Sequence, residues 1–187
     1  MKKLLLIISI ANLSLFSLKT LAQKETKKWS IGFLSEIGLP QGDVADTFKY
    51  SAGVSLRFSY HAGPGFATLS AGGVAYIPKN LLSGVFDTSS SSQNDLKVGL
   101  QIPIKAGYKF IFKHYFFVMA EIGISSYNYY YTDVNGNEQS TKYKGCFTFA
   151  PSAGFQYHAL EIGIKYETFQ VNGSSVSNIA LRSGFNF

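Results

Sequence analysis

Residues 96–110 alternate between apolar and polar or small side chains, and this pattern constrains the fold more than any other part of the sequence. The apolar set is Leu96, Val98, Leu100, Ile102, Ile104, Ala106, Tyr108 and Phe110. Since neighbouring residues of a strand point to opposite faces, the segment predicts one long β-strand with one apolar face. Strands of soluble domains average about five or six residues, whereas a tilted strand that crosses a membrane needs about 9–11. The length therefore favours a membrane-spanning strand.

The same alternation recurs along the chain and predicts eight strands. Their approximate ranges are 27–39, 50–60, 66–77, 96–110, 115–131, 143–157, 160–169 and 179–187. Short connections at 61–65, 112–114 and 158–159 alternate with longer, more polar ones at 40–48, 79–95, 132–142 and 170–175. An even strand number with short turns on one side and long loops on the other is typical of bacterial membrane barrels. We therefore expect an all-β fold, an eight-stranded antiparallel up-and-down transmembrane β-barrel.

The amino terminus predicts a secretory signal peptide over residues 1–22. Two lysines precede a mostly apolar run over residues 4–18, and Ala22 stands at the expected cleavage site before Gln23. An amino-terminal membrane anchor is the alternative, but the run is short and is interrupted by four polar residues. The β-barrel domain is then expected to comprise residues 23–187.

The basic composition does not indicate a nucleic-acid-binding protein. The sequence holds 17 Lys and Arg against 11 Asp and Glu, and three of the lysines lie in the predicted signal peptide, which leaves 14 basic residues and a net charge of +3. These residues are scattered along the chain rather than gathered in a basic stripe. Cys146, the single cysteine, lies on a strand pattern and is expected to be a small packing residue.

The sequence predicts no catalytic, cofactor or metal site. His61, His114 and His158 all fall in short turns, at the end of the barrel opposite the long loops. A Ser–His–acid set at the outer rim is therefore not expected, and a shared metal site on three separate turns is not favoured. The paired glycines lack the strand–helix context of a phosphate-binding loop. We expect that the protein is not an enzyme.

The two faces of the strands leave two classes of barrel open. In a soluble carrier of the lipocalin kind the apolar face lines a cavity, whereas in a membrane barrel it faces lipid. The apolar face here carries almost no charge, which favours the membrane. The polar face carries charges of both signs in mid-strand. Those expected to form a network in the lumen are Glu36, Arg57, Lys105, Glu121, Lys165, Glu167 and Arg182.

This network has two interpretations. The interior of an eight-stranded barrel is narrow and filled by side chains, and charges inside it must pair or bind water. We therefore expect the paired charges to plug the lumen, and a narrow channel for ions or small solutes is the alternative. A turn centred on Lys113 would place Lys105 opposite Glu121, and the last strand would place Arg182 beside Glu36.

Two features strain the strand pattern. Pro103 and Pro151 lie inside predicted strands, where proline cannot donate to the ladder, and bulges are expected there. The third strand changes phase before Val74 and Tyr76, so a bulge at residues 72–73 is expected to return these side chains to the apolar face. Tyr76 is then expected in an aromatic girdle at the outer end of the barrel.

The last strand resembles the carboxyl-terminal assembly signal of Gram-negative outer-membrane barrels, which ends on an aromatic residue with apolar residues at every second position upstream. Ile179, Leu181, Phe185 and Phe187 fit this pattern, and Ser183 is the exception. The chain after the signal peptide also resembles the small eight-stranded barrels of the OmpA and OmpX type, in particular those of Bacteroidetes-like bacteria.

The resemblance implies a protein of the Gram-negative outer membrane with both termini in the periplasm. Its expected partners are outer-membrane lipid around the wall and the barrel-assembly machinery at the last strand. A structural, adhesive or surface-interaction role is implied, and the segment 79–95, which is apolar over residues 81–86, is the expected site for an extracellular partner. A lipid-A-modifying enzyme is a less favoured alternative.

Overall fold

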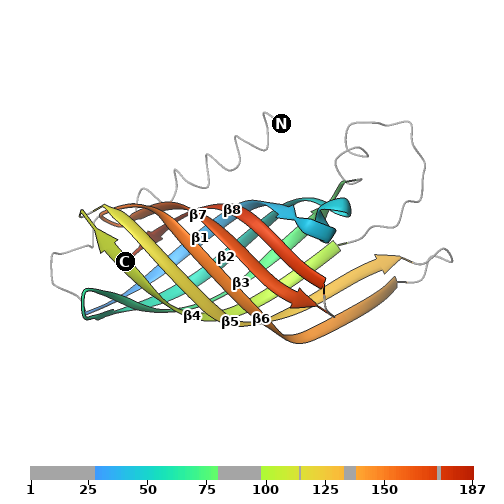
Figure 1. The fold of residues 1–187 in the computed structure, drawn as a ribbon, viewed down its shortest axis with the longest axis horizontal. Helices are drawn as coiled ribbons and strands as arrows, with labels where there is room; N and C mark the ends of the chain where they lie inside the picture. Colours follow the sequence, from blue (N-terminus) through green and yellow to red (C-terminus); the bar gives the residue numbers. More distant parts are fainter. Residues whose placement is uncertain (1–27, 80–97, 114, 133–137, 172–173) are drawn as a thin grey trace.

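The chain forms a closed barrel of antiparallel strands in which each strand pairs with the next and β8 pairs with β1 (Figure 1). The computed structural model describes residues 28–79, 98–113, 115–132, 138–171 and 174–187. The strands are β1 (Trp29–Gln41), β2 (Phe48–Ala62), β3 (Gly65–Pro78), β4 (Val98–Phe112), β5 (Phe116–Thr132), β6 (Glu138–Tyr157), β7 (Leu160–Val171) and β8 (Ser174–Asn186). A 3-10 helix, η2 (Gly42–Asp46), joins β1 to β2. The predicted fold class is confirmed.

Two parts of the predicted organisation lie outside the described residues. They are the signal peptide with its cleavage site between Ala22 and Gln23, and the segment 79–95 beyond Lys79. Among the residues that are described, no helix has the length and apolar character needed to span a membrane.

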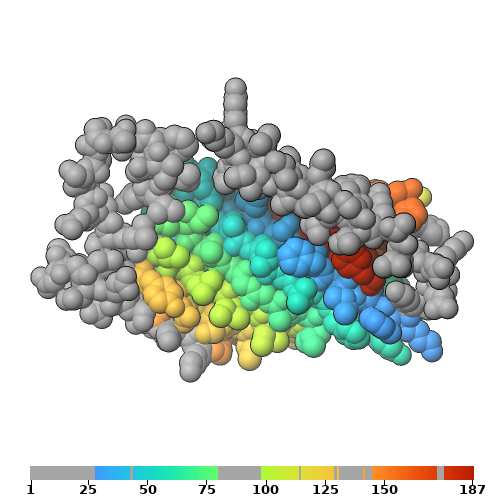
Figure 2. Space-filling view, turned by 180° about the vertical axis from the view of Figure 1, so that it is seen from behind, coloured from blue at the N-terminus to red at the C-terminus, as the bar shows by residue number. Residues whose placement is uncertain are grey.

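Alternate side chains of each strand point to opposite sides of the wall. On β4, Ile104 is 52% exposed on the outside, whereas the next residue, Lys105, is 4% exposed and points into the lumen. The side chains of β1 to β5 form a continuous outer surface in the space-filling view (Figure 2). The apolar face is therefore the outer face, which is the arrangement of a membrane barrel and the reverse of a soluble carrier.

The last strand closes the cylinder by pairing with β1 along most of its length. Its register with β1 runs from Gly32 opposite Asn186 to Gln41 opposite Ser177. Phe187 extends the seam, since its N–H donates to the carbonyl of Ile31 at 2.8 Å and its carbonyl accepts from the N–H of Ile31 at 3.0 Å.

Ser183, the exception in the terminal apolar pattern, lies opposite Ser35 at the same seam. The Oγ atoms of Ser35 and Ser183 are 3.2 Å apart, and the hydroxyl of Ser35 is 3.3 Å from the carbonyl oxygen of Ser183. A hydroxyl on an apolar outer face needs such a partner. The two serines therefore satisfy each other across β1 and β8.

The prediction of bulges at the two prolines is wrong. Pro103 lies opposite Ser125 in an unshifted β4–β5 ladder, while the β3–β4 ladder omits two positions between Ala71 and Val74 and resumes in the same register. Pro151 behaves in the same way, because β6 pairs regularly with β5 and omits two positions against β7. Each proline therefore interrupts one of its two ladders without adding a residue.

The prediction of a phase switch in β3 is also wrong. The β2–β3 register is continuous through residues 72–73, so Val74 and Tyr76 point into the lumen. Tyr76 is 1% exposed and does not belong to an outer girdle. Both side chains therefore belong to an apolar part of the lumen at the loop end of the barrel.

The expected pairing of Lys105 with Glu121 is wrong by two positions. Phe112 pairs with Phe116, so the connection comprises residues 113–115, and Lys105 lies opposite Gly123. Lys113 adopts a positive φ of 49° and the N–H of Tyr115 donates to the carbonyl of Phe112 at 3.3 Å, which moves the reversal one residue further along the chain. A shift by two keeps every side chain on its predicted face.

Strands β5 and β6 continue beyond the barrel as a two-stranded extension, visible at the loop end in Figure 1. They pair up to Thr132 and Glu138, whereas β6 pairs with β7 only from Thr148 onward. An extra residue on β6 shifts the register near Ser125, where Gly145 has a positive φ of 70°. This glycine allows the bulge at which the hairpin leaves the wall.

Candidate functional site

The candidate site is the charged interior of the barrel. All seven charged residues selected from the sequence point inward, with exposed fractions from 0% for Arg57 and Glu121 to 6% for Glu36. They come from six of the strands, because the inner face of each strand contributes every second residue. Since buried charges are costly unless paired, the geometry of their contacts decides what the interior can do.

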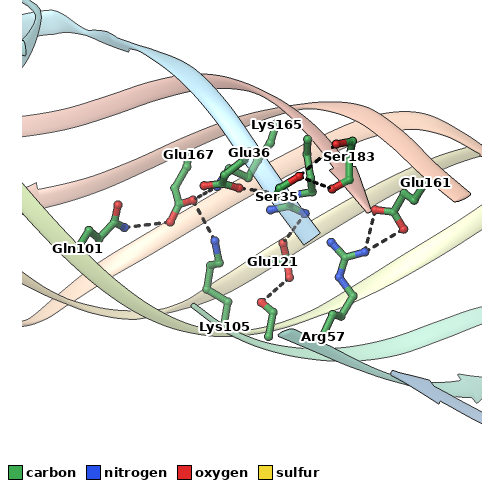
Figure 3. A network of polar contacts seen from close by, with 12 residues as sticks. Ser35, Glu36, Arg57, Gln101, Lys105, Glu121, Glu161, Lys165, Glu167 and Ser183 are labelled. Carbon is green, nitrogen blue, oxygen red and sulfur yellow. Dashed lines mark hydrogen bonds and ion pairs between the residues drawn. The ribbon is translucent and has the colours of Figure 1, made fainter. Parts of the chain in front are cut away.

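The central contacts join β1, β4 and β7 (Figure 3). Lys165 on β7 donates from Nζ to Glu36 Oε1 on β1 at 2.6 Å and also pairs with Glu167. Lys105 Nζ reaches Glu167 Oε2 across the lumen at 2.9 Å, and Gln101 Nε2 donates to the other oxygen of Glu167 at 3.0 Å. Three donors therefore converge on the carboxylate of Glu167.

Arg182 connects these contacts to β5. Its Nε lies 3.6 Å from Glu36 Oε2 and its Nη1 lies 3.4 Å from Glu121 Oε2. The hydroxyl of Ser70 donates to the other oxygen of Glu121 at 2.7 Å. Glu36, Lys105, Glu121 and Arg182 thus lie in one connected set together with Lys165 and Glu167, a set of three acids and three bases. We call these six residues the central network.

Arg57 belongs to a second group nearer the short turns. Its Nη1 donates to both oxygens of Glu161, at 2.8 and 3.0 Å. Lys109 Nζ binds the same carboxylate at 2.5 Å and lies 4.6 Å from the centre of the Phe117 ring. Asn186 Nδ2 lies 3.3 Å from Glu161, and Lys109 Nζ also donates to Gln156 Oε1 at 2.5 Å. We call Arg57, Lys109 and Glu161 the lower cluster.

The lumen at the loop end is filled by apolar side chains, which the alternation pattern did not predict. The members of this outer apolar cluster are Phe48, Val74, Tyr76, Tyr127, Cys146, Phe169 and Val176, with Val44 of η2 and Val171 packed against them. The hydroxyl of Tyr76 donates to Gln101 Oε1 at 2.9 Å, which connects the cluster to the central network. Large apolar residues on the charged face of three strands were the sequence signal for it.

A small cavity, with a volume of about 10 Å³, lies between these groups and is lined by Glu36, Ser70, Pro103, Lys105 and Arg182 among others. This is about the volume that one water molecule requires. Within the part of the chain that the structure describes, no group of three or more His, Cys, Asp or Glu side chains is placed to hold a metal ion. The interior supports charge pairing and steric closure.

The closed barrel, with charged side chains inside and apolar side chains outside, has the fold of the small eight-stranded outer-membrane barrels. The chain is similar to Ail of Yersinia pestis, whose structure in complex with the heparin analogue sucrose octasulfate gives a TM-score of 0.61 at 16% identity and covers 85% of this chain and 97% of that one. It is also similar to the amino-terminal barrel domain of Pseudomonas aeruginosa OprF, with a TM-score of 0.58 at 12% identity over 84% and 97% of the two chains.

A third similar structure is Neisserial surface protein A, with a TM-score of 0.56 at 9% identity over 87% of this chain and 98% of that one. No protein-family model matches the sequence, and no curated protein matches it. At these identities the likeness is one of fold, since one fold supports many functions.

Proposed function

We propose that this chain is a non-catalytic protein of the Gram-negative outer membrane that acts at the cell surface through its long loops. The observation that carries the proposal is the filled lumen, from Phe169 at the loop end to Glu161 at the short-turn end. A barrel filled with packed side chains and paired charges supports its loops rigidly and offers solutes no continuous path through the lumen. The central network and the outer apolar cluster together act as the plug.

A narrow channel is the alternative, and the row of charged side chains along the lumen is the observation that favours it. Recordings of the refolded protein in planar lipid bilayers distinguish the two. The plug predicts no steady single-channel current. A current that changes in Arg182→Met, but not in the control Leu181→Met on the outer face of the same strand, would show that the lumen conducts.

We propose that the segment 79–95 binds the extracellular partner. The similar Ail was solved with a heparin analogue, so heparin is the first probe. Binding of heparin to the refolded barrel is measured for the full chain, for a variant with residues 80–94 replaced by a Gly–Ser linker, and for a control with residues 133–137 replaced. Loss of binding in the first variant alone supports the assignment, and equal binding by all three contradicts it.

We further propose export and assembly by the signals at the two ends. Cleavage between Ala22 and Gln23 predicts a mature chain that begins at Gln23, which mass spectrometry of the purified protein checks. Recognition of the last strand by the barrel-assembly machinery predicts that deletion of Phe187 slows folding in native outer membranes. Protease added to intact cells is expected to cut the long loops and spare both termini, which would then lie in the periplasm.

A further inference from the structure

The guanidinium group of Arg57 is fully buried and only partly used. Its Nη1 binds the Glu161 carboxylate (Figure 3). Its Nε and Nη2 are buried and have no hydrogen-bond partner among the described residues. A buried charged donor left unpaired costs more than a neutral one, and an arginine cannot escape the cost by losing its proton.

A second unpaired donor lies on the neighbouring strand β3. The hydroxyl of Thr68 is buried and also has no partner among the described residues. Arg57 pairs with Ser70 and Ser59 pairs with Thr68 in the β2–β3 register, so Thr68 is the diagonal neighbour of Arg57 on the inner face. The hydroxyl of Ser70 is engaged by Glu121. Arg57 and Thr68 are therefore diagonal neighbours on the inner face of adjacent strands, and each has a donor without a partner among the described residues.

The lower cluster also carries an unbalanced charge. The single carboxylate of Glu161 serves both Arg57 and Lys109, which leaves one positive charge in excess. The central network does not offset this excess by count, because its three acids balance its three bases. Isolated charge in a low-dielectric interior is strongly disfavoured, and a water molecule accepts hydrogen bonds without neutralising it.

These observations point to one kind of ligand. The Nε–H and Nη2–H groups form the side edge of the guanidinium, where two parallel donors bind one acceptor. Three donors and an excess positive charge select a group that only accepts hydrogen bonds and carries a negative charge. We propose that the lower cluster binds a monovalent halide, chloride under physiological conditions, through Arg57 Nε, Arg57 Nη2 and Thr68 Oγ1.

The site is independent of what the loops bind. The halide neutralises the short-turn end of the lumen, so its binding stabilises the folded barrel by an amount that rises with the logarithm of the halide concentration once the site is largely occupied. The midpoint of thermal unfolding is therefore expected to rise when chloride replaces gluconate at constant ionic strength. The full chain refolded in detergent is used, and bromide replaces chloride in crystals so that its anomalous scattering locates the ion.

Two variants locate the effect. Thr68→Val removes one hydroxyl with little change in shape. It is expected to lower the apparent affinity for halide, measured from the shift of the unfolding midpoint, roughly tenfold, because one hydrogen bond to a charged group is lost. Ser152→Ala is the matched control, because the hydroxyl of Ser152 is likewise buried without a partner among the described residues but belongs to β6. Its halide response is expected to match that of the native protein.

An anomalous peak beside Arg57 and a response weakened only by Thr68→Val support the site. An unfolding midpoint that does not depend on the halide at fixed ionic strength overturns it. The proposal is equally overturned by density beside Arg57 without bromide signal, or by a Thr68→Val response equal to that of the control.

Discussion

A lysine placed on the outer wall tests the orientation of the two faces most directly. The change is Ala106→Lys on β4, whose outer-face neighbours Leu69 and Ile122 are both more than half exposed. The matched control is Ala67→Lys on β3, which starts from the same residue type on the same outer face. The two substitutions differ in depth along the barrel.

The depth of each site follows from the strand bounds. Ala106 lies six residues from Phe112 at the short-turn end of β4, and Ala67 lies two residues from Gly65 at the same end of β3. A rise of about 3.4 Å per residue and a tilt of about 40° give about 2.6 Å of depth per residue. Ala106 therefore lies about 16 Å above the rim, close to the middle of an apolar band about 25 Å tall, and Ala67 lies about 5 Å above it.

The expected cost of Ala106→Lys is about 2–4 kcal/mol of folding free energy, and that of Ala67→Lys is about 0–1 kcal/mol. Urea unfolding in lipid vesicles measures both, with the fluorescence of Trp29, the single tryptophan, as the probe. Equal destabilisation by the two lysines would refute a lipid-facing outer wall. Lys105 shows the contrast within the native chain, because a lysine one residue away is accommodated by pairing with Glu167 inside.

Three further outcomes are expected. Phe169→Ala, which opens the outer apolar cluster, is expected to lower stability by about 3–5 kcal/mol in vesicle unfolding, and a loss below 1 kcal/mol would show that the cluster is loosely packed. Glu167→Gln removes the negative charge that faces two buried ammonium groups and is expected to lower the free energy of unfolding by about 3–5 kcal/mol. Adding Lys105→Met is expected to restore part of this stability, and no recovery would contradict the coupling. Gly123→Ala is expected to prevent normal folding on gel-mobility assays, because its Cβ would lie 2.0 Å from the Ile104 carbonyl, whereas Gly73→Ala is expected to fold normally, because nothing lies within 4 Å.

The face on which each charged residue lies could be read from the sequence, and the partner of each could not. Alternation predicts Lys105 and Glu121 inside the barrel for either position of the turn, because a register error of two residues preserves the face. The partner of Lys105 is Glu167, three strands away across the lumen. Contacts across a closed cylinder depend on curvature and side-chain length, which a pattern of neighbouring residues does not contain.

Alternation also failed where the inner face changes character along its length. Tyr76 and Val74 are apolar and were placed outside, yet they fill the lumen at the loop end. The outer surface is uniform because lipid is uniform, while the interior is charged in the middle and apolar above. A rule that assigns apolar residues to lipid holds only where the interior is polar.

The long sequence separations within the central network bear on how this molecule enters a bilayer. Lys165 and Glu36 are 129 positions apart, and Arg182 meets Glu121 across 61 positions. Arg182 lies on β8, the last strand of the barrel in chain order, so the acids of β1 and β5 lack this partner until β8 has paired with β1. A half-curled sheet would expose these ions to hydrocarbon at a cost of several kcal/mol each. Closure of the barrel and its insertion into the bilayer must therefore proceed as a single event.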